Sequence, residues 1–212
     1  VRHREGVNMQ SVTEALGTAV FAYLVGSIPA AYVIARYVVG ADVREIGEGN
    51  AGARNVFHEV GRFWGFATFL ADFGKGALVA AVFIGSPTWQ IFLAGAFVFL
   101  GHAYPVWLRF VGGKGLATVG GFSVVLVPWA AVIGGAASGV VWTLTRRFLP
   151  TTVAAIVAAI VAAPLLGYRV VVVVSVLGLF VLTGVKRALD EPRMRRVEAR
   201  TGWDRSAGGS RR

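Results

Sequence analysis

The chain of 212 residues contains no cysteine and few charged side chains. The absence of cysteine excludes disulfides, zinc sites built on thiolates and a cysteine nucleophile. Only 15% of the residues are charged, whereas a soluble globular domain carries about a quarter. Hydrophobic residues make up 56% of the chain. This composition excludes a water-soluble domain and indicates a protein embedded in a membrane.

Charged side chains are absent from five long stretches. The runs without Asp, Glu, Lys or Arg are Ala15–Ala35, Ala77–Leu108, Gly115–Thr145, Phe148–Tyr168 and Val170–Val185. A sixth apolar segment, Phe63–Ile84, contains only the charged residues Asp72 and Lys75. A membrane-spanning helix needs about 20 apolar residues. Because these runs also lack the alternation of barrel strands, we predict an all-α polytopic membrane protein.

The positions of Lys and Arg predict the orientation of these helices, because short cytoplasmic loops collect basic residues. The basic segments are 40–62, 109–115, 146–147 and 186–212, which together hold sixteen of the 21 basic residues. These segments all lie on the cytoplasmic side of the membrane only if Gly115–Thr145 enters the membrane and returns to the same side. The helix would then break at Pro128 or at Gly134 and Gly135. We therefore predict about seven helices, five full crossings plus two half-length helices, with the N-terminus outside and the C-terminus inside.

The same pattern divides the chain into three parts. We expect an extracytoplasmic segment at 1–11, a single transmembrane domain at 12–185 and a basic cytoplasmic tail at 186–212. The tail is expected to attract anionic headgroups, by about 1 kcal/mol per basic residue near the surface. We expect a multi-pass protein of the plasma membrane and no nucleic-acid partner, since the basic excess accompanies a highly apolar chain.

Two polar loops on the predicted cytoplasmic side are rich in glycine. They read ADVREIGEGNAGARN (Ala41–Asn55) and GHAYPVWLRFVGGKGLATVGG (Gly101–Gly121). Glycines let successive backbone N–H groups form an anion nest, and Arg44, Arg54 and Lys114 add the charge that a phosphate needs. No GxxxxGK[ST] pattern is present, and the alternative reading is that these loops only join helices.

A few polar residues interrupt the apolar segments. Asp72 and Lys75 are three residues apart, so they either neutralise each other or serve a functional site. His102 either caps local structure or transfers protons. Ser27, next to Pro29, either bonds the preceding turn or faces a cavity. No grouping of His and carboxylates has metal-ligand spacing, so we expect no metal and no cofactor.

Four segments together resemble the membrane acyl-phosphate glycerol-3-phosphate acyltransferases, the PlsY family. The resemblance runs from about Tyr23 to Gly121 and rests on AYLVGSIP, DVREIGEGNAGARNVFHEVGRFWG, LADFGKG and GHAYPVWLRFVGGKGLATVGG, in the order and spacing of that family. The family is described as having seven membrane helices, an external N-terminus and a cytoplasmic C-terminus.

The resemblance implies an enzyme of phospholipid biosynthesis. It would transfer a fatty acyl group from acyl phosphate to the 1-hydroxyl of glycerol 3-phosphate, giving lysophosphatidic acid and phosphate. We expect catalytic roles for Ser27, Arg44, His102 and Lys114. The expected substrate-binding residues are Gly49, Asn50, Gly52, Arg54, Asn55, Gly112, Gly113 and Gly115. An apolar groove between helices would hold the acyl chain, and no acyl-enzyme is needed because acyl phosphate is already activated.

The sequence departs from the family at three points. GSGN is GEGN here, which places Glu48 beside the expected phosphate site, and GATN is GARN, which introduces Arg54. We hypothesise that Glu48 and Arg54 pair with each other. The family's last helix ends in RHRENI, and an ungapped alignment through Gly178 puts Val185 and Ala188 at its functional His and Asn.

These departures leave two alternatives to the acyltransferase. One is an inactive relative that binds phosphate or an anionic lipid as a regulatory or partner protein. The other, ranked third, is a small transporter, for which the glycines and the intramembrane Asp72 and Lys75 are the only indication.

Overall fold

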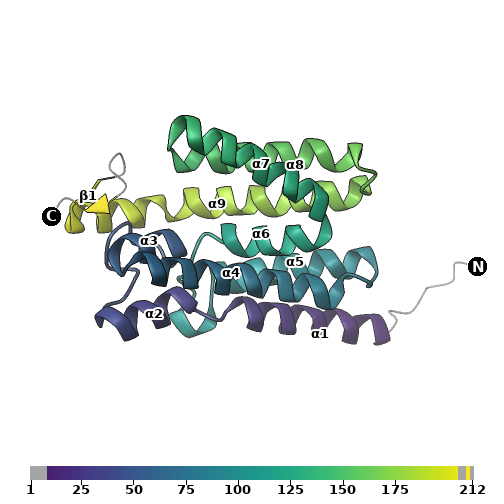
Figure 1. Cartoon of the computed structure of the whole chain (residues 1–212). Helices are drawn as coiled ribbons and strands as arrows, with labels where there is room; N and C mark the ends of the chain where they lie inside the picture. Colours follow the sequence, from purple (N-terminus) through teal and green to yellow (C-terminus); the bar gives the residue numbers. More distant parts are fainter. Residues whose placement is uncertain (1–8, 205–208, 211–212) are drawn as a thin grey trace, which may run out of the picture.

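The computed structural model describes residues 9–204 and 209–210 and is built almost entirely of helices (Figure 1). The elements in chain order are α1 (Met9–Gly26), α2 (Ala30–Val39), α3 (Ala53–Glu59), α4 (Arg62–Phe83), α5 (Thr88–Ala103), η1 (Val106–Leu108), α6 (Leu116–Leu126), α7 (Pro128–Thr145), α8 (Phe148–Leu165), α9 (Val170–Thr201), β1 (Trp203–Asp204) and β2 (Gly209–Ser210). The two short strands pair antiparallel. The all-α prediction is confirmed.

Five segments are long and apolar enough to cross a membrane, as predicted. They are Met9–Val39, Arg62–Phe83, Thr88–Leu108, Phe148–Leu165 and Val170–Thr201. The first combines α1 and α2, which are separated by a break at Ser27–Pro29, because proline cannot donate the next helical hydrogen bond. The side of the membrane on which each terminus lies remains a prediction from the charge pattern.

The uncharged run Gly115–Thr145 forms two helices that run in opposite directions (Figure 1). The break lies at Pro128, as predicted. With 11 residues, α6 is half-length, but α7 has 18 residues and is longer than predicted. Helix α7 continues through Gly134. This glycine lets α7 pack closely on α8, since a β-carbon there would collide with the backbone of Ala155.

Small residues bring the helices of the first half into close contact. A β-carbon on Gly76 of α4 would collide with the backbone of Thr118 in α6, and one on Gly121 of α6 with that of Phe73. Gly101 of α5 approaches the backbone of α1 in the same way. Close backbone packing of this kind is typical of membrane helices. It fixes α1, α4, α5 and α6 relative to one another, and the site lies between their ends.

Helix α9 continues without a break across residue 185, where the basic tail was expected to begin. Its 32 residues correspond to about 48 Å, whereas the apolar core of a bilayer is about 30 Å thick. The polar end of α9 therefore extends beyond the membrane-sized part of the bundle and lies at the same end of the molecule as α2 and α3 (Figure 1).

Candidate active site

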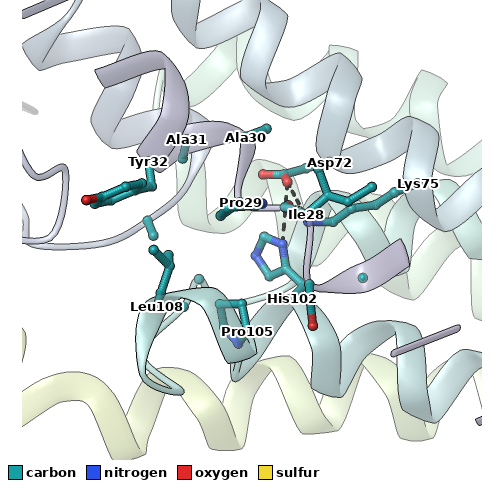
Figure 2. A pocket seen from close by; sticks show the side chains of 15 residues that line it. Ile28, Pro29, Ala30, Ala31, Tyr32, Asp72, Lys75, His102, Pro105 and Leu108 are labelled. Atoms are coloured by element: carbon teal, nitrogen blue, oxygen red, sulfur yellow. Dashed lines mark hydrogen bonds and ion pairs between the residues drawn. The ribbon is translucent and has the colours of Figure 1, made fainter. Parts of the chain in front are cut away.

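A small pocket lies at the break between α1 and α2. Its cavity volume is about 10 Å³, roughly the space that one water molecule needs. Residues of the break, α2, α4, α5, η1 and both glycine-rich loops line it, among them Ser27, Ile28, Tyr32, Ala51, Asp72, Lys75, His102, Leu108 and Gly113. Figure 2 shows polar side chains from α4 and α5 that meet at this pocket. Segments separated by most of the first half of the chain thus form one site.

Three ionisable side chains form a buried network inside the pocket. Lys75 Nζ lies 2.9 Å from Asp72 Oδ1, and His102 Nδ1 lies 3.5 Å from the same oxygen. Lys75 Nζ also donates to the carbonyl of Ile28 at 3.2 Å, which ties α4 to the break before Pro29. Asp72 and Lys75 therefore pair as predicted, and the pair both stabilises the break and holds His102.

His102 and Ser27 present polar atoms to this pocket. The second ring nitrogen of His102, Nε2, points away from Asp72 (Figure 2). Ser27 is fully buried, and within the described residues its Oγ has no hydrogen-bond partner. Leaving a buried hydroxyl unbonded costs free energy that a bound ligand can recover. Two of the four predicted catalytic residues therefore line one cavity.

Arg44 lies at the rim of the pocket and is held from three sides. It forms a 2.6 Å ion pair with Asp42, donates to the carbonyl of Leu108 at 2.8 Å and stacks over Tyr32 at 5.5 Å. Burial raises the pKa of the Asp42 carboxyl, but the hydrogen bonds and charge of Arg44 outweigh this effect and hold that pKa below its usual range. Because Tyr32 and Leu108 both line the pocket, Arg44 is held next to it, with its charge paired to Asp42.

Asn55, predicted to bind substrate, uses its side-chain amide within the first loop. Its Nδ2 donates to the carbonyls of Val43, Ile46 and Asn50 at 2.8–3.1 Å, and its Oδ1 accepts from the N–H of Glu48 at 3.0 Å. The side chain is fully buried. Asn55 therefore holds the shape of the loop, and both N–H donors of its amide are already used.

Glu48 joins the two glycine-rich loops. Its carboxylate lies 3.1 Å from Arg54 Nη1 and 3.7 Å from Lys114 Nζ. The hypothesised pair of Glu48 and Arg54 is confirmed, and the second contact, to Lys114, was not anticipated. Arg54 and Lys114, predicted to bind phosphate, share one carboxylate in this structure. Their attraction for an anion is reduced accordingly.

The amide nests predicted from the glycines are not formed at four of the positions. The N–H groups of Gly49, Gly52, Gly112 and Gly113 donate to backbone carbonyls at 3.0–3.2 Å. The residues serve close packing instead, since a β-carbon on Gly113 would collide with the His102 ring. Gly115, with a φ of 83°, begins α6. The sequence showed where glycines occur but not where their N–H groups point.

Helix α9 contributes polar residues that the sequence analysis missed. Val185 and Ala188, the positions aligned with the family's His and Asn, are exposed on the outside of the helix. Polar residues that face the bundle include Lys186, which pairs with Asp190 at 2.6 Å, and Arg193, which donates to the carbonyl of Gly49 at 2.8 Å. Their spacing of four and three residues is helical, a signal that could have identified them.

A second cavity is almost wholly apolar and lies between α5, α6 and α9. Its volume is about 460 Å³, and it is lined by Phe92, Phe122, Leu126, Ser175, Val176, Gly178, Leu179 and Leu182. A groove of this size and character suits a hydrocarbon chain. Within residues 9–204 and 209–210, by contrast, no three His or carboxylate side chains are grouped to hold a metal ion.

Comparison with known proteins gives consistent matches to this fold and site. Residues 16–191 match the family model described as glycerol-3-phosphate acyltransferase. A glycerol-3-phosphate acyltransferase from Endomicrobium trichonymphae is 32% identical over 179 residues, which cover 81% of this chain and 90% of that protein. One from Anaeromyxobacter sp. (strain Fw109-5) is 45% identical over 130 residues, or 58% of this chain and 64% of that protein. The chain spans about half to two thirds of several other relatives.

Solved structures agree with these sequence matches. The crystal structure of PlsY (YgiH), an integral membrane glycerol 3-phosphate acyltransferase, in its glycerol 3-phosphate form superposes with a TM-score of 0.75 and 30% identity, covering 85% of this chain and 92% of that chain. Its lysophosphatidic acid form gives a TM-score of 0.72 and 29% identity, with 85% and 91% covered. The match of the family model over most of the chain, together with these structures, shows that the chain belongs to the PlsY family of glycerol-3-phosphate acyltransferases.

Proposed function

We propose that this protein transfers a fatty acyl group from an acyl phosphate to the 1-hydroxyl of glycerol 3-phosphate. The observation that carries the proposal is the pocket at the α1–α2 break, where Ser27 and His102 present polar atoms beside a fixed arginine. The apolar groove between α5, α6 and α9 would take the acyl chain. The predicted cytoplasmic side of the two loops gives access to the water-soluble acceptor, and the basic end of α9 would attract anionic headgroups.

In this mechanism the 1-hydroxyl of glycerol 3-phosphate attacks the acyl carbonyl carbon. His102 Nε2 accepts the hydroxyl proton, while Asp72 holds the other ring nitrogen and so keeps Nε2 directed at the pocket. The new ester C–O bond forms, the C–O bond to phosphate breaks, and phosphate leaves with the electron pair. Ser27 Oγ would bond the carbonyl oxygen or the attacking hydroxyl, and Arg44 would stabilise the charge on phosphate.

An activated donor removes the need for a covalent enzyme intermediate. Acyl phosphate carries its own leaving group, so the pocket has only to orient the acceptor hydroxyl and remove its proton. The chain has no cysteine, and Ser27 Oγ makes no hydrogen bond to any described residue, so no base activates it as a nucleophile in this structure.

The test is direct assay of the purified protein with acyl phosphate and glycerol 3-phosphate, measuring lysophosphatidic acid and phosphate. We expect both products from the wild type and a loss of at least 100-fold in Arg44→Gln, in the range for removal of one charged group in a transition state. Arg36→Gln is the matched control, since Arg36 is an exposed arginine of α2 and should leave the rate unchanged.

A second candidate is an inactive relative that binds phosphate, favoured by the exposure of Val185 and Ala188, where the family has its His and Asn. Retained binding of glycerol 3-phosphate with no product from the wild type would support this second candidate. Product formed at equal rates by the wild type and Arg44→Gln would contradict the proposed mechanism.

A further inference from the structure

The polar half of α9 packs against the first glycine-rich loop. Arg193 Nη1 donates to the carbonyl of Gly49, and Thr201 Oγ1 to that of Gly47, both at 2.8 Å. A β-carbon on Gly49 would also collide with Val197. These contacts join residues about 150 positions apart, so the end of α9 forms one wall of the loop that reaches the pocket.

Arg193 makes only part of the hydrogen bonds that its guanidinium group allows. Its Nη2 is buried and, within the described chain, has no hydrogen-bond partner. The Asp190 carboxylate lies 3.9 Å away, beyond hydrogen-bond length, and that carboxylate is bound at 2.6 Å by Lys186. Arg193, whose side chain is 31% exposed, thus keeps one buried N–H group that no acceptor in the described chain bonds.

An unsatisfied acceptor lies on the other side of the same contact. Asn50 follows Gly49 in the chain and is 6% exposed. Its Oδ1 is buried and makes no hydrogen bond to any residue that the structure describes. A buried donor and a buried acceptor, one on each side of Gly49, are costly without a partner. Ala51, the next residue, lines the catalytic pocket, so Asn50 lies next in the chain to a residue of that pocket.

The surrounding charges favour an anion. Arg193 reaches the loop from α9, and Arg54 and Lys114 approach it beside Glu48. The Glu59 side chain also lies against the loop, at Gly47, so cations outnumber carboxylates there by three to two. A phosphate monoester, which carries nearly two negative charges at neutral pH, would be attracted to this cluster.

We propose that Arg193 and Asn50 bind glycerol 3-phosphate, with Arg193 Nη2 donating to a phosphate oxygen and Asn50 Oδ1 accepting from a glycerol hydroxyl. A charged hydrogen-bond donor suits a phosphate, and a neutral hydrogen-bond acceptor suits a hydroxyl. Glycerol 3-phosphate carries both groups, whereas acyl phosphate has no carbon-bound hydroxyl. The inference rests on the proposed function. It places a substrate-binding residue on α9, where the exposed Val185 and Ala188 cannot contribute one.

The experiment measures the KM values of both substrates for the wild type, Arg193→Gln and Arg193→Lys. We expect Arg193→Gln to raise the KM of glycerol 3-phosphate about 10- to 100-fold, the effect of losing one charged hydrogen bond, while the KM of acyl phosphate stays unchanged. Arg193→Lys should restore part of this loss. Arg195→Gln is the matched control, since Arg195 is 72% exposed and lies about 200° around the helix from Arg193.

Three results would overturn the inference. An unchanged KM of glycerol 3-phosphate in Arg193→Gln would show that the residue does not bind substrate. A rise in the KM of acyl phosphate alone would assign the residue to the donor. Equal rises in both KM values with a lower melting temperature would show a purely structural role, through the contact with Gly49.

A binding measurement separates this inference from the proposed reaction. Equilibrium binding of labelled glycerol 3-phosphate to the detergent-purified protein should be weakened by Arg193→Gln and by Asn50→Ala, and not by Arg195→Gln. If the wild type forms no lysophosphatidic acid but shows this pattern, the proposed reaction fails and the binding site stands. If the wild type is active and all variants bind equally, the reaction stands and the site fails.

Discussion

The two polar clusters of the molecule differ in how completely their groups are satisfied. In the pocket at the α1–α2 break, Ser27 Oγ has no partner within the described residues, and His102 has one ring nitrogen directed away from its partner Asp72. The second cluster, the loop cluster, lies in and around the first glycine-rich loop. There the Asn55 amide makes hydrogen bonds to four backbone groups, and Glu48 pairs with two cations.

This difference distinguishes residues that act on the substrate from residues that hold the site in shape. A site must keep polar atoms available for substrate, and it tolerates the cost because the ligand satisfies them. A loop that carries such a site needs most of its buried polar groups bonded internally, as around Asn55, and leaves unsatisfied only atoms available to a ligand, such as Asn50 Oδ1. Substitutions in the pocket should therefore reduce the rate at nearly constant stability, and substitution of the internally bonded Asn55 should reduce stability first.

The largest effect is expected from His102→Gln. Glutamine fits the pocket and bonds Asp72 but cannot accept a proton, so kcat should fall about 100- to 10,000-fold, the range for loss of a general base. The melting temperature in detergent should stay near the wild-type value. A rate within threefold of the wild type would mean that the pocket does not supply the base, and the comparison between the clusters would fail.

Asn55→Ala should have the next largest effect, and on stability. Four hydrogen bonds are lost, and three carbonyls and one N–H are left in a buried loop, so the free energy of unfolding should drop by roughly 3 kcal/mol. Denaturant unfolding in micelles measures it. Asn55→Asp keeps the acceptor for Glu48 but places a buried carboxylate against three carbonyl oxygens, so it should lose at least as much stability. Wild-type stability with a raised KM in Asn55→Ala would show instead that this amide binds substrate.

Much of the fold could be predicted because it depends on local composition. Four uncharged runs and the segment interrupted only by Asp72 and Lys75 identified the five long apolar segments, and Pro128 identified the break between α6 and α7. The full length of α7 could not be predicted, because Gly134 looks like a helix interruption in sequence. In the structure it serves as a contact point for α8.

The site was less predictable because it depends on where backbone groups point and on how distant helices meet. Ser27 and His102 were each identified singly, but their common pocket depends on close backbone packing between α1 and α5 at residues such as Gly101. Arg193 was missed because an ungapped alignment directed attention to Val185 and Ala188. A helical wheel of α9 places Lys186, Asp190 and Arg193 on one face, on which Lys186 is buried and the other two are partly buried.

A smaller effect is expected from Glu48→Ala. Removal of the shared carboxylate leaves Arg54 and Lys114 without this partner, so inorganic phosphate and glycerol 3-phosphate should bind a few-fold more tightly, by about 1 kcal/mol. The inhibition constant of phosphate measures this, with Glu48→Gln as the control of equal size. Weaker binding in both variants would show that Glu48 orients the cations toward the substrate. The loop cluster would then take part in substrate binding.

The smallest effect is expected from acidification, through Asp42. The pKa of its carboxyl is below the ordinary value because of Arg44, so the pair stabilises the folded state fully above the unfolded pKa and loses this contribution as the pH falls through the folded pKa. The melting temperature of the wild type should exceed that of Asp42→Asn by a constant margin above about pH 5, and the margin should close at lower pH. A margin that persists in strong acid would mean that Asp42 holds Arg44 by packing alone, and the rim of the pocket would then be independent of charge.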